Sequence, residues 1–383
     1  MKILYISHTF PPIFGGVERQ NYYLSEELKK IAQVKIIANG RGKIWLPVFL
    51  PLTFIRAFFL MFSYDACLMG NGVLAPIGAT LKFFHPKKGF FCTVHGLDIT
   101  FAYKKGFLAK TYAAINIPSL KKMDKLFMVG NYTIDEAARI GIRRDHCVFI
   151  PNGIRLEELV VPCSRTDMEK ILGVDLAGKK VILRIARFVP HKGVEWFLRN
   201  VLPRLPENYF FVAVGGVVSS KAAGDENNFQ ACKKAIEELA LSKRAKLIGN
   251  IPEHDKLVLL NSADLYISPN IKIPGSMEGF GITAIEGAAC GRVVLASDLE
   301  GLKDAIKDEQ DGFLVEHENA DAWVEKIKAV LADDFFRKEF GEKCCQFVIE
   351  NYSWSKIAKK YLEEIQSVIS KSKNQNLELN ILG

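Results

Sequence analysis

Lys179-Lys-Val-Ile-Leu-Arg-Ile-Ala186 is an apolar run of strand length that opens a second series of strands and helices. The chain begins in the same way, because Lys2-Ile-Leu-Tyr-Ile-Ser7 is typical of a buried parallel strand. A glycine-rich turn and a helical pattern over residues 17–31 follow it. Residue 186 is likewise followed by a loop and a helical pattern. Two such openings predict two α/β units.

Further strand-like runs continue each series, with helical stretches between several of them. They are residues 34–38, 66–69, 89–94, 125–129 and 147–150 in the first series, and 210–214, 245–248, 263–268, 293–296 and 312–315 in the second. Repeated strand–helix alternation implies a doubly wound parallel sheet. A chain of 383 residues is also too long for one ordinary core. We therefore expect two Rossmann-like domains, 1–160 and 161–353, that face a central cleft.

Composition and cysteine use indicate a globular cytoplasmic protein. Hydrophobic residues make up 49% and charged residues 25% of the chain. The eight cysteines are scattered, without C-x-x-C or the spacing of zinc ligands, so we expect free thiols in a reducing compartment. The short apolar start contains Lys2 and is expected to be a strand rather than a signal peptide.

Charge and apolar residues are unevenly placed in the first half. Residues 81–144 contain 12 Lys or Arg and 4 Asp or Glu, an excess equal to the net charge of +8 of the whole chain. The preceding stretch, residues 44–62, has 19 residues and a single charge, Arg56. It approaches the roughly 20 residues of a membrane span, but Pro47, Pro51 and Arg56 favour a buried or interfacial helix and turn.

The motifs of several nucleotide and metal sites are absent. Neither domain opens with G-x-G-x-x-G, and the chain has no P-loop and no D-x-D. Dinucleotide redox chemistry and P-loop ATP hydrolysis are therefore unsupported, and a metal-held diphosphate lacks a carboxylate clamp. A diphosphate bound without metal needs positive charge and backbone donors. We expect neither a metal nor another cofactor.

Two loops that follow opening strands could supply such groups. Arg187 and Lys192 follow the first strand of the second series, where open α/β sheets bind ligands, and both residue types suit phosphate. Gly15-Gly16 lies in the equivalent loop of the first series and could bring backbone N–H groups against the same phosphate. A solvated loop and a plain turn are the simpler interpretations.

His95 follows the strand at residues 89–94 and is expected at the cleft, although a hydrogen-bonded loop histidine would fit equally well. His8 and His191 occupy comparable loops. In Ser276-Met-Glu-Gly-Phe-Gly-Ile-Thr-Ala-Ile-Glu286, Glu278 is expected just before a helix over residues 282–289 and Glu286 one turn inside it. The two carboxylates could hold two sets of ligand hydroxyls. Acidic residues that merely favour a helix N-terminus are the alternative.

Taken together, these residues resemble the retaining nucleotide-sugar glycosyltransferases of family 4, which have the two-Rossmann GT-B fold. The similarity runs in register over nearly the whole chain. Its motifs are Gly15-Gly16-Val17-Glu18, Val94-His95-Gly96, Ile150-Pro-Asn-Gly-Ile154, Arg187 with Lys192-Gly193, Glu278 with Glu286, and Ala288-Ala-Cys-Gly291. Tyr352-Ser-Trp-Ser-Lys-Ile-Ala358 resembles the helix, here about residues 354–371, that completes the first domain in such proteins.

The resemblance implies a role for each residue. Arg187 and Lys192 would hold the donor diphosphate, Glu286 the ribose, and Glu278 the transferred sugar. Backbone N–H groups of the following loop would help Glu278, and His95 would lie beside the anomeric carbon. The implied donor-binding residues are Gly15, Gly16, Arg187, Lys192, Glu278, Gly279, Phe280, Gly281 and Glu286, and the implied catalytic residues are His95, Arg187, Lys192 and Glu278.

The resemblance also implies the reaction, a metal-independent, hexosyltransferase-like transfer with retention of configuration, as in polysaccharide biosynthesis. Because the domain that contains the basic and apolar stretches receives the acceptor in such proteins, we expect a lipid-linked or cell-envelope acceptor. We also expect peripheral binding to an anionic membrane, and no nucleic-acid partner. The candidate contacts are Lys104, Lys105, Lys121, Lys122, Phe101 and Phe107. A solvated basic face with a soluble acceptor is the alternative.

The chain departs from the family pattern at several positions, and two other functions stay open. Ala186 replaces Gly, Arg155 replaces Asp, Gly287 replaces Ala, Arg292-Val293 replaces a small residue and Pro, and the loop 215–225 lacks Gly-x-Gly. A nucleotide-sugar 2-epimerase would use the same nucleotide site but needs acid/base carboxylates, for which Asp98 and Glu18 are the candidates. A non-catalytic nucleotide-sugar-binding homologue is the other alternative.

Overall fold

The computed structural model describes residues 1–383 except 13–14, 104, 218–224 and 382–383. The chain divides into two compact units. The first comprises Met1–Gly153 and Trp354–Gly383, and the second comprises Ile154–Ser353. We expected the boundary after residue 160; the contacts place it after Gly153.

The first unit is built on a six-stranded parallel sheet with the order β2-β1-β3-β4-β5-β6. The short apolar runs of the sequence form its strands, as expected of strands that are covered on both faces. These are β1 Lys2–Ser7, β2 Gln33–Ala38, β3 Ala66–Met69, β4 Gly89–Val94, β5 Lys125–Met128 and β6 Cys147–Phe149. Neighbouring side chains of one strand enter opposite cores, as Phe90 and Phe91 do.

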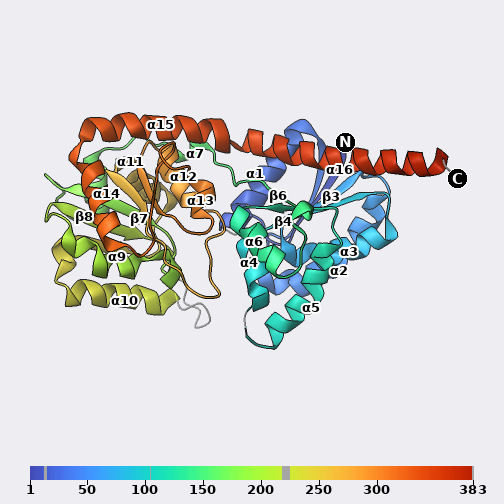
Figure 1. Cartoon of the computed structure of the whole chain (residues 1–383), viewed down its shortest axis with the longest axis horizontal. Coiled ribbons are helices and arrows are strands. Elements are labelled where there is room, and N and C mark those ends of the chain that lie inside the picture. The colour runs from blue at the N-terminus through green and yellow to red at the C-terminus, as the bar shows by residue number, and fades with distance from the viewer. Residues whose placement is uncertain (13–14, 104, 218–224, 382–383) are drawn as a thin grey trace. The chain divides into compact units, whose positions relative to one another are not determined.

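Helices cover both faces of this sheet (Figure 1). One layer contains α1 Gly16–Ile31 and α16 Trp354–Ile381. The other contains α2 Leu46–Met61, α3 Ala75–Phe84, α5 Phe107–Lys121 and α6 Asn131–Arg139, and the short α4 Gly96–Thr100 follows β4. Trp354 begins α16 and packs so closely on Gly153 that a Cβ atom there would lie 2.6 Å from its ring.

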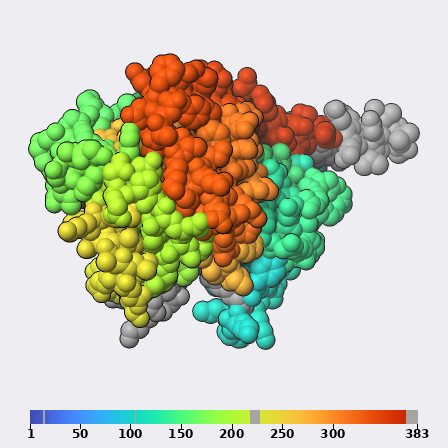
Figure 2. Space-filling model, turned by 60° about the vertical axis from the view of Figure 1, so that its left-hand side comes forward, coloured from blue at the N-terminus to red at the C-terminus, as the bar shows by residue number. Residues whose placement is uncertain are grey.

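The second unit repeats the architecture with the order β12-β11-β10-β7-β8-β9. Its strands are β7 Lys180–Ile185, β8 Tyr209–Val214, β9 Ala245–Ile248, β10 Leu265–Ser268, β11 Val294–Ser297 and β12 Phe313–Val315. Its helices are α7 Leu156–Leu159, α8 Arg165–Leu172, α9 Val194–Asn200, α10 Asp225–Glu238, α11 Glu253–Ser262, α12 Ile282–Ala289, α13 Leu302–Ala305, α14 Ala320–Ala332 and α15 Asp334–Tyr352. Helices α14 and α15 form the orange to red surface of this unit in Figure 2. The expectation of two doubly wound Rossmann-like domains is confirmed.

Each sheet reverses its strand order at one point. In the first unit, β1 pairs with both β2 and β3, and in the second unit β7 pairs with both β8 and β10. Ligands of doubly wound sheets bind outside the carboxyl ends of the strands at such a point. The loops after β1, β3 and β4 and those after β7 and β10 are therefore the places in which a site is expected.

Candidate functional site

The loop after β7 brings Lys192 against the segment that follows β10. Gly193 has φ +70, and a Cβ atom there would lie 1.7 Å from the Pro269 carbonyl oxygen. Only glycine permits both this backbone conformation and this close approach. The Lys192-Gly193 pair in the sequence is therefore explained by the contact between the two loops that flank the switch point.

Lys192 forms an ion pair with Glu278, the first carboxylate of the Glu278–Glu286 stretch. The Asn270 amide also donates to Glu278 Oε2 at 3.2 Å. Burial raises the pKa of the Glu278 carboxyl, but the Lys192 ammonium outweighs burial and holds that pKa at about 2. Burial lowers the pKa of Lys192, and Glu278 opposes this shift. Glu278 is therefore a fixed anion at neutral pH.

A buried arginine that we did not single out from the sequence supports this pair. Arg184 is 1% exposed and lies in β7. It donates to Ser268 Oγ at 2.8 Å and to Asn270 Oδ1 at 2.9 Å. Because Arg184 occupies the Asn270 oxygen, the Asn270 nitrogen is directed to Glu278. The signal in the sequence was a charge inside an otherwise apolar strand.

Glu300 is a second residue that sequence reasoning missed. It is buried, and its φ of +51 is unfavourable for any residue except glycine. Its carboxylate accepts the backbone N–H of Glu278 at 2.7 Å and pairs with Lys272 at 2.7 Å. Strained conformations of this kind concentrate at functional sites. The signal that could have found Glu300 is its place in the loop after β11.

The loop from Glu278 to Gly281 and helix α12 have the predicted form. Helix α12 spans Ile282–Ala289, as the sequence indicated, and Glu286 is buried one turn inside it. Phe280 is buried with its ring 5.8 Å from that of Tyr352. The neighbouring Gly279 carbonyl would lie 2.4 Å from a Cβ atom on Gly301, so the segment after β11 presses on this loop.

Arg187 and His191 complete the surroundings of Lys192. Arg187 is exposed just after β7, and its charge acts on both His191 and Lys192. His191 is buried, and its Nδ1 lies 2.8 Å from the Ser276 hydroxyl. Burial and the Lys192 charge lower the pKa of His191 to about 3. The structure thus pairs Lys192 with Glu278 and places the Arg187 charge near Lys192, while Glu286 lies on the helix that follows Glu278.

The first unit has a different set of polar groups at its switch point. His95 caps helix α4, and Asp98 accepts the backbone N–H groups of His95 at 2.9 Å and of Gly72 at 3.0 Å. Burial lowers the pKa of His95, although the Asp98 charge opposes it. The buried His95 Nε2 has no hydrogen-bond partner among the described residues. Burial therefore keeps His95 a neutral imidazole.

Gly15 and Gly16 lie at the N-terminus of α1, in the same unit. Gly15 is the N-cap residue, and its extended backbone precedes the first helical turn. Glu18 in that turn accepts the Thr9 hydroxyl at 2.6 Å. His8 lies nearby at the end of β1 with its Nε2 3.3 Å from the Asn71 amide, and burial lowers the pKa of His8. A Cβ atom on Gly15 would lie 2.3 Å from Glu18 Oε2, so the Glu18 carboxylate packs against this turn.

The residues predicted to contact a membrane are dispersed over the helix α5 region. Phe107, Lys105, Lys121 and Lys122 are exposed. Phe101 is only partly exposed, and its ring lies 5.2 Å from that of Tyr112. Phe101 is thus a packing residue as well as a surface residue. Lys104 lies outside the described residues.

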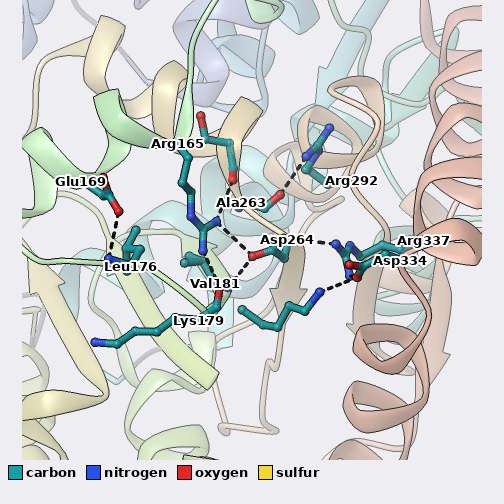
Figure 3. Close-up of polar contacts among 12 residues, drawn as sticks. Arg165, Glu169, Leu176, Lys179, Val181, Ala263, Asp264, Arg292, Asp334 and Arg337 are labelled. Carbon is teal, nitrogen blue, oxygen red and sulfur yellow. Dashed lines mark hydrogen bonds and ion pairs between the residues drawn. The ribbon is translucent and has the colours of Figure 1, made fainter. Parts of the chain in front are cut away.

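A polar cavity of about 430 Å³ lies at the amino ends of β7 and β10, away from the switch-point loops. Arg165 and Arg337 contact different oxygens of Asp264 there, at 3.0 and 3.2 Å (Figure 3). Arg292, one of the departures from the family pattern, donates to the Ala263 carbonyl at 2.8 Å. These arginines tie helices and strands to one another, so we assign this cluster a structural role.

The residues that the structure describes contain no group of three or more His, Cys, Asp or Glu side chains arranged to hold a metal ion. The polar groups near Glu278 are a lysine, an arginine, an amide and a carboxylate that is already paired. This set suits an anionic ligand with hydroxyl groups, because cations and N–H groups bind phosphate and carboxylates bind diols.

Comparison with known proteins shows which proteins this chain resembles. Residues 173–347 match the family described as Glycosyl transferases group 1. An N,N'-diacetylbacillosaminyl-diphospho-undecaprenol alpha-1,3-N-acetylgalactosaminyltransferase of Campylobacter jejuni is 28% identical over 287 residues, which are 73% of this chain and 70% of that protein. A phosphatidyl-myo-inositol mannosyltransferase of Mycobacterium leprae is 25% identical over 63% of this chain and 60% of that protein.

Solved structures show the same fold. The structure of Anabaena HepE in complex with UDP and glucose has a TM-score of 0.74 at 17% identity, and the match covers 96% of this chain and all of that one. WaaG, described as a glycosyltransferase involved in lipopolysaccharide biosynthesis, has a TM-score of 0.65 at 16% identity over 95% of this chain and 99% of that one. The expected GT-B fold is therefore confirmed.

Proposed function

We propose that this protein is a retaining, metal-independent glycosyltransferase of family 4, because residues 173–347 match the family described as Glycosyl transferases group 1. It transfers a sugar from a nucleoside-diphosphate sugar to a hydroxyl group of a lipid-linked or cell-envelope acceptor. The observation that carries the proposal is the Lys192–Glu278 ion pair at the switch point of the second sheet.

Two kinds of residue bind the nucleotide-sugar donor: cations bind its diphosphate, and carboxylates bind its hydroxyl groups. Lys192 and Arg187 bind the diphosphate, whose negative charge grows as the bond to the sugar breaks. Glu286 accepts the ribose hydroxyls. Glu278 accepts hydroxyls of the transferred sugar, and the N–H groups of Gly279, Phe280 and Gly281 bind further oxygens. The pKa of Glu278, held at about 2, keeps this carboxylate a hydrogen-bond acceptor.

The transfer needs no additional acid or base from the protein. The bond between the anomeric carbon and the phosphate oxygen breaks, and the acceptor oxygen bonds to the same face of that carbon. The acceptor proton passes to the departing phosphate oxygen. His95 is proposed to contact the transferred sugar through its unpartnered Nε2. The backbone at Gly15 and Gly16 is proposed to contact the donor phosphates.

The acceptor side of the proposal rests on the charge of the first unit and on the named relatives. Residues 81–144 carry an excess of positive charge equal to that of the whole chain. One relative is named for a diphospho-undecaprenol substrate and another for phosphatidyl-myo-inositol. We therefore propose a cytoplasmic enzyme that associates peripherally with an anionic membrane, where it meets a lipid-linked acceptor.

One experiment separates this proposal from the two alternatives. The protein is incubated with a panel of nucleotide sugars, with and without lipid-diphosphate sugar acceptors, and released nucleoside diphosphate is measured. We expect release that requires the acceptor and a glycosidic product with the donor's anomeric configuration. An epimerised nucleotide sugar, or binding without release from any donor, would replace the proposal by an alternative. The bonds already made by Asp98 and Glu18 disfavour the epimerase.

A further inference from the structure

Helix α2 carries an apolar stripe that faces away from the core of the first unit. Val48, Leu52, Ile55 and Phe59 recur every three or four residues, and each exposes at least half of its surface. Phe62 continues the stripe just beyond the helix and is 65% exposed. Residues at this spacing share one face of a helix. A face of five large exposed apolar side chains is unusual on a soluble surface and marks an interaction site.

The opposite face of α2 is fixed in the protein. Thr53, Ala57 and Met61 are at most 1% exposed, and Ala57 and Met61 belong to the core beneath the sheet. By length and composition alone, Lys43–Met61 could cross a membrane, and it is the one such helix among the described residues. A helix with one face packed on a sheet is placed to lie along a surface rather than to span it. The sequence left a buried or an interfacial segment open, and only a minority of α2 is buried.

The stripe continues onto helix α3. The rings of Phe58 and Phe84 lie 5.5 Å apart, and Phe62 packs on His85 at 4.7 Å. Phe83 at the end of α3 is 79% exposed. Helices α2 and α3 are neighbours in the same layer of the first unit (Figure 1). We call the exposed side chains of Val48, Leu52, Ile55, Phe59, Phe62 and Phe83 the α2–α3 face.

The surroundings of this face carry positive charge. Residues 28–97 contain nine Lys or Arg and a single acid, Asp65. The Asp65 carboxylate accepts the backbone N–H of Lys2. Arg56 and Lys87 are exposed, and Lys88 Nζ lies 3.5 Å from the carbonyl of Phe62, at the edge of the face. An apolar stripe with a basic margin is the composition of an interfacial helix on an anionic bilayer.

We propose that the α2–α3 face inserts into the headgroup region of an anionic lipid bilayer, with Arg56, Lys87 and Lys88 at the lipid phosphates. This proposal names the membrane contact of the proposed function and rests on it. A second copy of the chain is the competing occupant. A symmetric dimer would place the same basic margin against itself, and the single acid of residues 28–97, Asp65, already accepts the Lys2 N–H.

Sedimentation with lipid vesicles tests the proposal. The full chain is mixed with vesicles of phosphatidylcholine alone or with added phosphatidylglycerol, at low and high salt. We expect binding to the anionic vesicles that weakens as salt rises. Ile55→Ser with Phe59→Ser should lower the partition coefficient about tenfold or more, since two apolar side chains no longer enter the bilayer. Lys87→Glu with Lys88→Glu gives a second pair of substitutions that leaves the helix unchanged, with a similar expected loss.

Phe107→Ser is the matched control, because Phe107 is more exposed than Ile55 and Phe59 but belongs to α5. It should leave binding unchanged. The proposal is overturned if Phe107→Ser alone abolishes binding, if vesicles of both kinds bind equally, or if no vesicle binds. It is also overturned if the wild type dimerises without vesicles and Ile55→Ser with Phe59→Ser makes it monomeric.

A soluble short-chain acceptor distinguishes this test from a failure of the proposed function. With it, both pairs of substitutions should keep the wild-type rate of nucleoside diphosphate release. If the wild type binds vesicles yet transfers no sugar, the proposed function is refuted. The proposal that the α2–α3 face binds a membrane would still stand.

Discussion

The two units share one topology but differ in the groups at their switch points. In the second unit, Lys192 and Glu278 form a largely covered ion pair next to the buried Arg184. In the first unit, His8 and His95 are histidines whose pKa values burial lowers, so both are neutral at pH 7. We propose that the charged contacts to the donor lie in the second unit, whereas the first unit contributes the neutral His95 and the backbone at Gly15 and Gly16.

The largest effect is expected at Lys192. Lys192→Ala should lower turnover by about a hundredfold, or about 3 kcal/mol, because leaving-group charge develops in a site that excludes water. The loss of turnover should exceed the loss of sugar binding. Steady-state kinetics per mole of folded enzyme measures this loss of turnover. Arg165→Ala, in the cluster at the amino ends of the same strands, should lower stability instead and keep turnover; the reverse pattern would break the comparison.

A smaller effect is expected at Glu300. Glu300→Gly should lower turnover about tenfold, or about 1.4 kcal/mol, because the Glu278 N–H loses its acceptor and the sugar-binding loop shifts. Stability should not fall in proportion, since glycine relieves the strain of φ +51, which is worth about 1 kcal/mol. Chemical unfolding measures the change in stability, and kinetics on the same preparation measures the change in turnover. Parallel losses of stability and turnover would assign Glu300 to folding alone.

The histidines of the first unit should make stability depend on pH. The pKa of His95 is lowered in the folded protein, so the unfolded chain binds the proton more readily. The contribution to stability is therefore complete above the unfolded pKa of about 6.5 and is lost as pH falls below it. Urea unfolding at about pH 7.5 and 5.5 should show a smaller loss for His95→Gln than for the wild type. An equal loss in the two proteins would mean that His95 is not the neutral group described above.

The smallest effect is expected from chelation. Sugar transfer should be unchanged in excess EDTA, because we propose that Lys192 and Arg187 neutralise the diphosphate without a metal. The control adds magnesium after EDTA. If EDTA abolished transfer and magnesium restored it, the diphosphate would be bound with the help of a metal ion, and the metal-free proposal would be wrong.

Much of the fold could be predicted because the signals are local. Short apolar runs and glycine-rich turns gave every strand to within one or two residues at either end, and helix α12 has the expected bounds. The charged motif residues also lie where the pattern placed them, after β7 and before α12. Glu278 and Lys192 meet because Gly193 allows their loops to touch, and the sequence contained that glycine.

The missed residues depend on contacts that no local pattern reveals. Arg184 stands in an apolar strand and matters because it meets Ser268 and Asn270, which lie more than eighty positions away in the chain. Glu300 matters because a loop after β11 folds onto Glu278. The exposed stripe of α2 was hidden for another reason. An apolar run in the sequence indicates that a helix is hydrophobic. Which face of that helix is covered depends on how it packs in the folded protein.

Nucleoside diphosphate binding tests the central claim most directly. Thermal shift titrations with UDP, GDP and ADP are made on the wild type, Glu286→Ala, Glu278→Ala and His95→Gln. One nucleotide, at ~100 times its dissociation constant, should stabilise the wild type by about 2.7 kcal/mol. Glu286→Ala should weaken that binding because the ribose loses its acceptor, whereas Glu278→Ala and His95→Gln should preserve it. If no nucleotide binds, or if His95→Gln weakens binding as much as Glu286→Ala does, the assignment of the nucleotide to the second unit is contradicted. Equal losses of affinity in Glu286→Ala and Glu278→Ala would instead refute the division between ribose and sugar contacts.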